Sequence, residues 1–134
     1  MSTTSATTIT IERDRWIPFM EQFTRENRGA HATLEVIRND IGDQVETGDR
    51  PFDGVSADLK GSARAVWITF GSTPENHFTH GVHEVKAVRV ILARPDRGDV
   101  FEVESDDGTK TLLTLSRPED FALPPANPPE GTKK

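Results

Sequence analysis

The amino-acid sequence predicts an α+β protein in which one N-terminal amphipathic helix packs on a mostly antiparallel sheet of six or seven strands. We expect the sheet to form a roll or a small barrel. The helix is predicted by large apolar residues at the i, i+3, i+4 and i+7 spacing of one helical face: Trp16, Phe19, Met20 and Phe23. After Gly29, apolar and polar residues mostly alternate, which is typical of strands with one buried face.

Capping residues predict where this helix begins and ends. Asp14 is a suitable N-cap, and Pro18 is tolerated in the first turn because the amides there have no partners within the helix. The helix should end near Asn27, since Gly29 can adopt the left-handed conformation that follows many helices.

Alternating segments separated by turn residues predict the strands. The Asp106-Asp107-Gly108 segment favours a tight hairpin because glycine supplies the positive φ that such a turn needs. Residues 39–51 are rich in Asp, Gly and Asn and predict a turn or a loose hairpin. The imperfect alternation in 85–93 indicates a bulge. The predicted strands are 7–12, 32–38, 55–59, 65–70, 85–93, 99–105 and 109–115.

Large apolar residues from the strands should complete the core beneath the helix. The segment 65–70 is apolar on both faces, which favours a central strand or one covered by the helix. We therefore expect the helix face to pack against Trp67, Phe70, Phe101 and Leu113.

The length of 134 residues predicts one globular domain, which we place at 7–116. Residues 1–6 are small and polar and should be frayed, and residues 117–134 hold five of the nine prolines and should form a disordered tail. The chain has no cysteine, which excludes disulfides and thiolate metal sites. It has neither a secretory signal nor a long apolar run, so we expect a soluble cytoplasmic protein without membrane contact.

The charge balance argues against a nucleic-acid partner. The chain has 16 basic and 22 acidic residues and a net charge of −6. Binding along a phosphate backbone needs clustered lysines and arginines, and here the basic residues are scattered.

The strongest candidate for chemistry is a histidine cluster. His77, His80 and His83 lie within seven residues, flanked by Glu75 and Glu84. Three imidazoles could bind zinc and leave an open position for water. On an extended strand, however, His77 and His83 share one face and His80 points to the other, so convergence would need a sharp bend at Gly81. The alternative is a polar loop and strand start in which one histidine is hydrogen-bonded into the structure.

Other catalytic patterns are weaker. Asp53, Asp58 and Glu35 could act as paired carboxylates in acid–base chemistry, but Asp58 lies on the polar side of its strand, where solvated charge is the default. The sequence contains no Gly-x-Ser-x-Gly motif and no glycine-rich phosphate loop. We therefore expect no cofactor and favour a protein that is not an enzyme.

Two surfaces could bind a protein partner. The apolar helix face contains residue types common in interfaces, but a lone helix beside a sheet must bury that face there. An exposed sheet edge that pairs with a second copy is the more ordinary way to form a dimer.

Several segments together resemble a known family. They are 11–16 with Phe19 and Phe23, 34–36 with 41–42, 54–60, 74–80 and 104–109. In this order they are similar to a family of short bacterial proteins catalogued only as a domain of unknown function, over about residues 9–115. In the family the tryptophan is usually followed by proline, whereas here Ile17 intervenes. The resemblance implies a single-domain soluble bacterial protein and brings no activity, cofactor or catalytic residue.

The sequence therefore predicts an architecture and no particular reaction. We expect a small non-enzymatic binding or assembly module that self-associates, with a homodimer or a small protein as its partner. The alternative is a metal-dependent binder or hydrolase that uses His77, His80 and His83.

Overall fold

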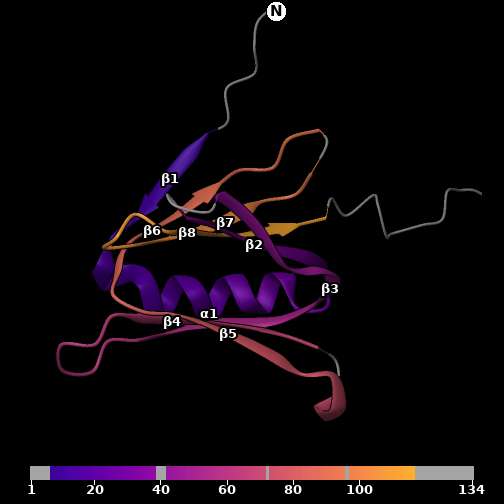
Figure 1. Cartoon of the computed structure of the whole chain (residues 1–134), viewed down its shortest axis with the longest axis horizontal. Helices are drawn as coiled ribbons and strands as arrows, with labels where there is room; N and C mark the ends of the chain where they lie inside the picture. The colour runs from indigo at the N-terminus through magenta and orange to yellow at the C-terminus, as the bar shows by residue number, and fades with distance from the viewer. Residues whose placement is uncertain (1–6, 39–41, 72, 96, 117–134) are drawn as a thin grey trace, which may run out of the picture.

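The computed structural model describes residues 7–38, 42–71, 73–95 and 97–116. Within them, one helix accompanies an eight-stranded sheet whose neighbouring strands are all antiparallel, in the order β1-β6-β7-β8-β2-β3-β4-β5 (Figure 1). Two short 3-10 turns, η1 (Arg13–Arg15) and η2 (Pro74–Asn76), precede α1 and β5. The other elements are β1 (Thr8–Ile11), α1 (Trp16–Asn27), β2 (His31–Arg38), β3 (Gly42–Asp58), β4 (Ala65–Phe70), β5 (Phe78–Val82), β6 (Val85–Ile91), β7 (Val100–Ser105) and β8 (Lys110–Leu115).

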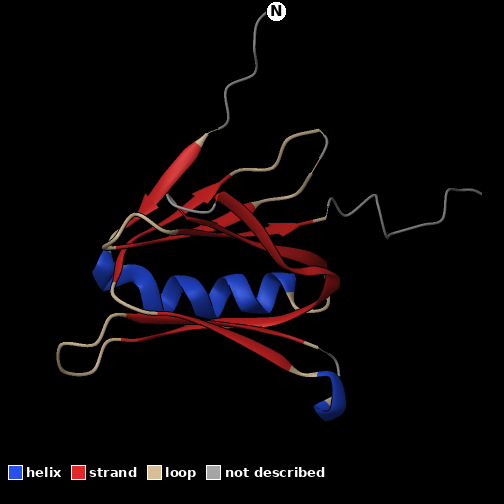
Figure 2. Ribbon diagram, viewed as in Figure 1, coloured by secondary structure: helices blue, strands red, loops and turns tan. Residues whose placement is uncertain are grey.

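The sheet folds over the helix, so that α1 lies between two layers (Figure 2). The first layer consists of β1, β6, β7, β8, β2 and residues 42–51 of β3. The second layer consists of residues 52–58 of β3 with β4 and β5. Strand β3 is 17 residues long and passes from one layer to the other, which is how a single sheet covers both sides of the helix.

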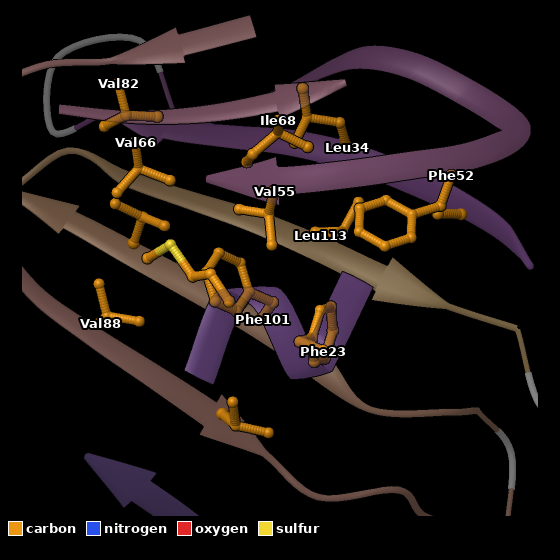
Figure 3. Packing of buried hydrophobic residues seen from close by; sticks show 14 of the residues in the cluster. Phe23, Leu34, Phe52, Val55, Val66, Ile68, Val82, Val88, Phe101 and Leu113 are labelled. Atoms are coloured by element: carbon orange, nitrogen blue, oxygen red, sulfur yellow. The ribbon is translucent and has the colours of Figure 1, made fainter. Parts of the chain in front are cut away.

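The core is formed by the helix face and the inner faces of both layers. Trp16, Met20 and Phe23 are buried, and Phe19 is partly buried against them, as the helical spacing predicts. The Phe23 ring lies 5.8 Å from the ring of Phe52 on β3 and 5.3 Å from that of Phe101 on β7 (Figure 3). One helix side chain therefore packs against both layers.

The predicted start of the helix is wrong. Asp14 belongs to η1, and no side chain caps either η1 or α1. The chain enters the helix differently: Trp16 donates its indole N–H to the Ile11 carbonyl at 2.9 Å, which anchors the first turn to the end of β1. The predicted end is confirmed, since Asn27 is the last helical residue and Gly29 has a φ of +92°.

Thr24 connects the helix to the part of β3 that β2 no longer covers. Its hydroxyl accepts the Val55 N–H at 2.9 Å and donates to the Val55 carbonyl at 3.2 Å. Pairing between β2 and β3 ends at Pro51, so these backbone groups lack a strand partner on that side. A buried threonine supplies the hydrogen bonds that a neighbouring strand would otherwise make.

The predicted count of six or seven strands is slightly too low, and the predicted barrel is wrong because the sheet is not closed. The prediction omits β5 and treats residues 42–51 as a turn or loose hairpin. Trp67 is a further correction: it is 36% exposed and lies outside the core. Its neighbours Val66 and Ile68 face inwards, so the strand's alternation places Trp67 on the outer face.

Other local predictions are confirmed. The turn between β7 and β8 contains Gly108 at a φ of +90°, and the register of β6 against β7 shifts between Val85 and Ala87. The predictions for residues 1–6 and 117–134 lie outside the described residues. No described helix combines the length and the apolar character needed to cross a membrane.

Candidate functional site

The histidine-rich segment surrounds β5, which forms one edge of the sheet. Its first histidine, His77, directly precedes the strand and lies beside an exposed carboxylate. The Nε2 atom of His77 is 3.4 Å from Oδ2 of Asp53, and Nε of Arg28 is 3.7 Å from Oδ1 of the same residue. Arg28 also donates to the Asp53 carbonyl at 3.0 Å. Asp53 is thus placed between two basic side chains at the surface.

His80 lies in the middle of β5, and His83 directly follows its last residue. His80 is paired with the buried Ile68 and faces inwards. His83 follows the strand, and its ring meets the Trp67 ring edge-on at 5.2 Å and 86°. His80 and His83 line a common cavity, whereas His77 does not belong to its lining.

The two histidines thus line one cavity but lie on different faces, since His80 faces inwards and the His83 ring contacts Trp67 on the outer face. Their faces follow strand alternation, because Gly81 continues β5 rather than bending it sharply. Within the described part of the chain, no group of three or more His, Asp or Glu side chains is placed to hold a metal ion.

The paired-carboxylate candidates are also placed apart. Asp58 accepts the Lys60 N–H at 3.1 Å and so stabilises the turn after β3. Glu35 lies on β2 between the buried residues Leu34 and Val36, so it faces away from the core in the first layer. Asp53, in contrast, is held at the second layer by Arg28 and His77.

The cavity has a volume of about 490 Å³ and lies where the two layers face each other beyond the helix. Val36 on β2 and Thr111 on β8 line it from the first layer, and His80 and Val82 line it from β5. Sequence reasoning did not identify Thr111 as part of a site. A signal was present, since Thr111 occupies the inward register that Leu113 and Leu115 fill further along β8.

The rim of the cavity is formed by the link from β5 to β6 and the turn from β7 to β8. Glu84 in that link has a φ of +53°, an uncommon conformation for a residue with a side chain. Its carbonyl accepts the Asp106 N–H at 2.9 Å, which ties the two turns together. Arg64 holds Asp106 from the other side with a hydrogen bond of 2.7 Å, and this bond lowers the pKa of the Asp106 carboxyl.

The outer edge of β5, the last strand of the sheet among the described residues, presents a defined set of backbone groups. Gly71 donates its N–H to the Pro51 carbonyl on β3 at 2.9 Å. The backbone groups of neighbouring residues in a strand point to opposite sides. The N–H and C=O of Phe70 therefore point towards β5, where Phe70 pairs with Phe78. The same alternation along β5 directs the N–H and C=O groups of Thr79 and Gly81 away from β4. The segment 78–82 contains no lysine and no proline, the residues that commonly block an edge.

Gly81 is covered on the outer face of the sheet by the Trp67 ring. A Cβ atom added at Gly81 would overlap the ring atoms Cζ3 and Cε3 of Trp67. The tryptophan ring therefore occupies the space that a side chain at position 81 would fill, which gives a large aromatic residue a contact outside the core.

Comparison with known proteins gives a family and no activity. No curated protein and no solved structure matches the chain. Residues 7–124 match a family of unknown function, DUF5335, which agrees with the resemblance seen in the sequence. This match covers all of the described residues, and the chain belongs to that family.

Proposed function

We propose that this chain is a small non-enzymatic binding or assembly module that self-associates as a homodimer through β5. The observation that carries the proposal is the open edge of the sheet at β5. Two residues there, Thr79 and Gly81, direct backbone donors and acceptors outwards, and no charged side chain within the strand opposes a second copy.

The edge at β5 can form a symmetric dimer about a two-fold axis beside the strand. Antiparallel pairing of β5 with its counterpart allows Thr79 of one copy to pair with Gly81 of the other, and the reverse, so both outward residues are satisfied by one symmetric contact. Gly81 has no side chain, and Trp67 supports its backbone from the outer face. The net charge of −6 further favours a protein partner over nucleic acid, and we expect the protein to act in the cytoplasm.

Thr79→Pro tests the dimer. Proline removes an outward N–H and leaves the hydrogen bonds between β5 and β4 intact, so we expect a folded monomer. Light scattering over a range of concentrations measures the mass, and circular dichroism checks the fold. Thr79→Ala is the matched control, because it loses the hydroxyl contact to Thr69 (3.3 Å) and keeps the amide; it should remain dimeric. A native protein that stays monomeric at every concentration contradicts the proposal.

The alternative is a metal-dependent binder or hydrolase that uses His77, His80 and His83. Its support is that His80 and His83 line the same cavity as Glu84. It also requires His77 to leave Asp53 and join them. Metal analysis and melting of untagged protein, with chelator and with added zinc, test it. Stoichiometric zinc and a melting shift that His80→Ala abolishes support the alternative, and no metal with no shift rejects it.

A further inference from the structure

We propose that the cavity beside β5 binds a small organic acid through a carboxylate group. This inference goes beyond self-association, because it concerns the inner faces of the two layers rather than the sheet edge. Three features carry it: a buried hydroxyl, a cation that lines the cavity, and apolar side chains from both layers.

The buried hydroxyl belongs to Thr111. This residue is 1% exposed, lines the cavity, and makes no side-chain hydrogen bond to any described residue. A buried hydroxyl without a partner costs free energy, so a threonine here rather than valine needs a reason. A ligand that accepts a hydrogen bond from this hydroxyl supplies one.

The cation belongs to Arg38 at the end of β2. Arg38 lines the cavity, is exposed, and forms no ion pair within 4.0 Å with a described residue. Its positive charge is the smallest of the effects that act on the pKa of the Asp107 carboxyl. A guanidinium can bind a carboxylate with two parallel hydrogen bonds, which makes it a good anchor for an organic acid.

The carboxylates of Asp107 and Glu84 also line the cavity, and that of Asp107 is engaged by the protein. Asp107 accepts the Thr109 N–H at 2.9 Å, and this bond lowers the pKa of the Asp107 carboxyl. Glu84 acts electrostatically on Arg64, whose pKa is raised chiefly by its hydrogen bond to Asp106. The hydrogen bond to Asp107 and the positive charge of Arg64 near Glu84 reduce the repulsion that an incoming anion meets.

The size and the apolar wall indicate an organic molecule rather than a bare ion. A volume of about 490 Å³ is within the range of small-molecule sites. Val36 and Val82 line opposite sides, one from each layer, and can contact a hydrocarbon portion while the carboxylate reaches Arg38.

The test uses succinate as the probe and succinamide, which has the same carbon skeleton without charge, as the comparator. Amide chemical shifts of the isotope-labelled full chain are followed during each titration. We expect succinate to shift the amides around Arg38, Gly81 and Thr111, and succinamide to leave them unchanged. Arg38→Gln should weaken succinate binding about tenfold or more, because a charge-assisted hydrogen bond is lost.

Two further variants separate binding from structure. Thr111→Val removes the hydroxyl at constant shape, so it should weaken succinate binding while leaving the melting temperature equal or higher. Arg28→Gln removes an exposed arginine outside the cavity and should bind succinate normally. The proposal is overturned if succinate shifts no cavity amide, if succinamide shifts them equally, or if neither Arg38→Gln nor Thr111→Val changes the affinity. A monomeric Thr79→Pro protein should still bind succinate.

Discussion

Thr24 shows how a single side chain can complete a sheet. Its hydroxyl forms hydrogen bonds with both the N–H and the C=O of Val55, just beyond the end of the pairing between β3 and β2. Threonine is an ordinary helix residue on sequence grounds, and nothing near it in the chain predicts this role, because Val55 lies 31 positions away.

Replacing Thr24 with valine should destabilise the protein by about 1–3 kcal/mol, the usual cost of leaving a buried backbone donor unpaired. Thr24→Ser keeps the hydroxyl and should lose much less. Urea unfolding of the three proteins measures the difference. A loss in Thr24→Ser with none in Thr24→Val would mean that packing of the Thr24 methyl group against Gly54, and not the hydroxyl, holds the helix to β3.

Trp67 marks the limit of sequence reasoning at the residue scale. Apolar residues on both faces of 65–70 correctly predict a strand flanked on both sides, since β4 lies between β3 and β5. They do not reveal that Trp67 points outwards, because the reason is Gly81 on the next strand. Only the pairing register brings these two residues together.

At the scale of secondary-structure elements, an ion-pair cluster crosses the outer face of β6 and β7. Arg89 hydrogen bonds to Glu102 at 2.5 Å and to Glu104 at 2.9 Å, and all three side chains are largely shielded from solvent. The hydrogen bond from Arg89 holds the pKa of Glu104 below its ordinary value.

This lowered pKa predicts acid sensitivity. The unfolded chain takes up a proton at Glu104 at a higher pH than the folded protein does, so the stabilisation is present at neutral pH and is lost as the pH falls below about 4. Glu104→Gln should lower the stability at neutral pH and flatten its decline in acid. Urea midpoints across the acidic range check this, with Glu75→Gln, an exposed residue of η2, as the control. A slope unchanged by Glu104→Gln would contradict the assignment.

The predicted elements with strong periodicity agree with the structure, and the missed ones depend on partners distant in the chain. The helix, the bulge in β6 and the hairpin between β7 and β8 follow from local residue patterns. The sequence does not predict β5 because His80 and Gly81 are poor signals of a strand. The strand forms because it pairs with β4. The composition of residues 42–51 predicts a turn, but these residues are extended because they pair with β2.

At the scale of the whole molecule, the described sheet has two edge strands, β5 and β1. The sequence predicts that an edge could pair with a second copy, but it cannot identify which one. That choice depends on the strand order, which brings β5 to the end of the sheet although four strands precede it and three follow it in the chain.

Hydrogen exchange should detect the proposed dimer at individual amides. At concentrations where the protein associates, the N–H groups of Thr79 and Gly81 should exchange slowly, and dilution should make them exchange fast. The amides of His80 and Val82, which bond to β4, should stay protected at both concentrations. Nuclear magnetic resonance resolves all four residues. Exchange at Thr79 and Gly81 that does not depend on concentration would place the contact elsewhere.

The length of β3 has a consequence for how this protein unfolds. Its 17 residues belong to both layers, and the helix between the layers is fastened to it by Thr24. Neither layer can separate from the helix without disturbing the strand that it shares with the other layer. The molecule should therefore lose its structure in one cooperative step, and the buried Trp16 and the outer Trp67 should sense the same transition, although they lie on opposite sides of the second layer.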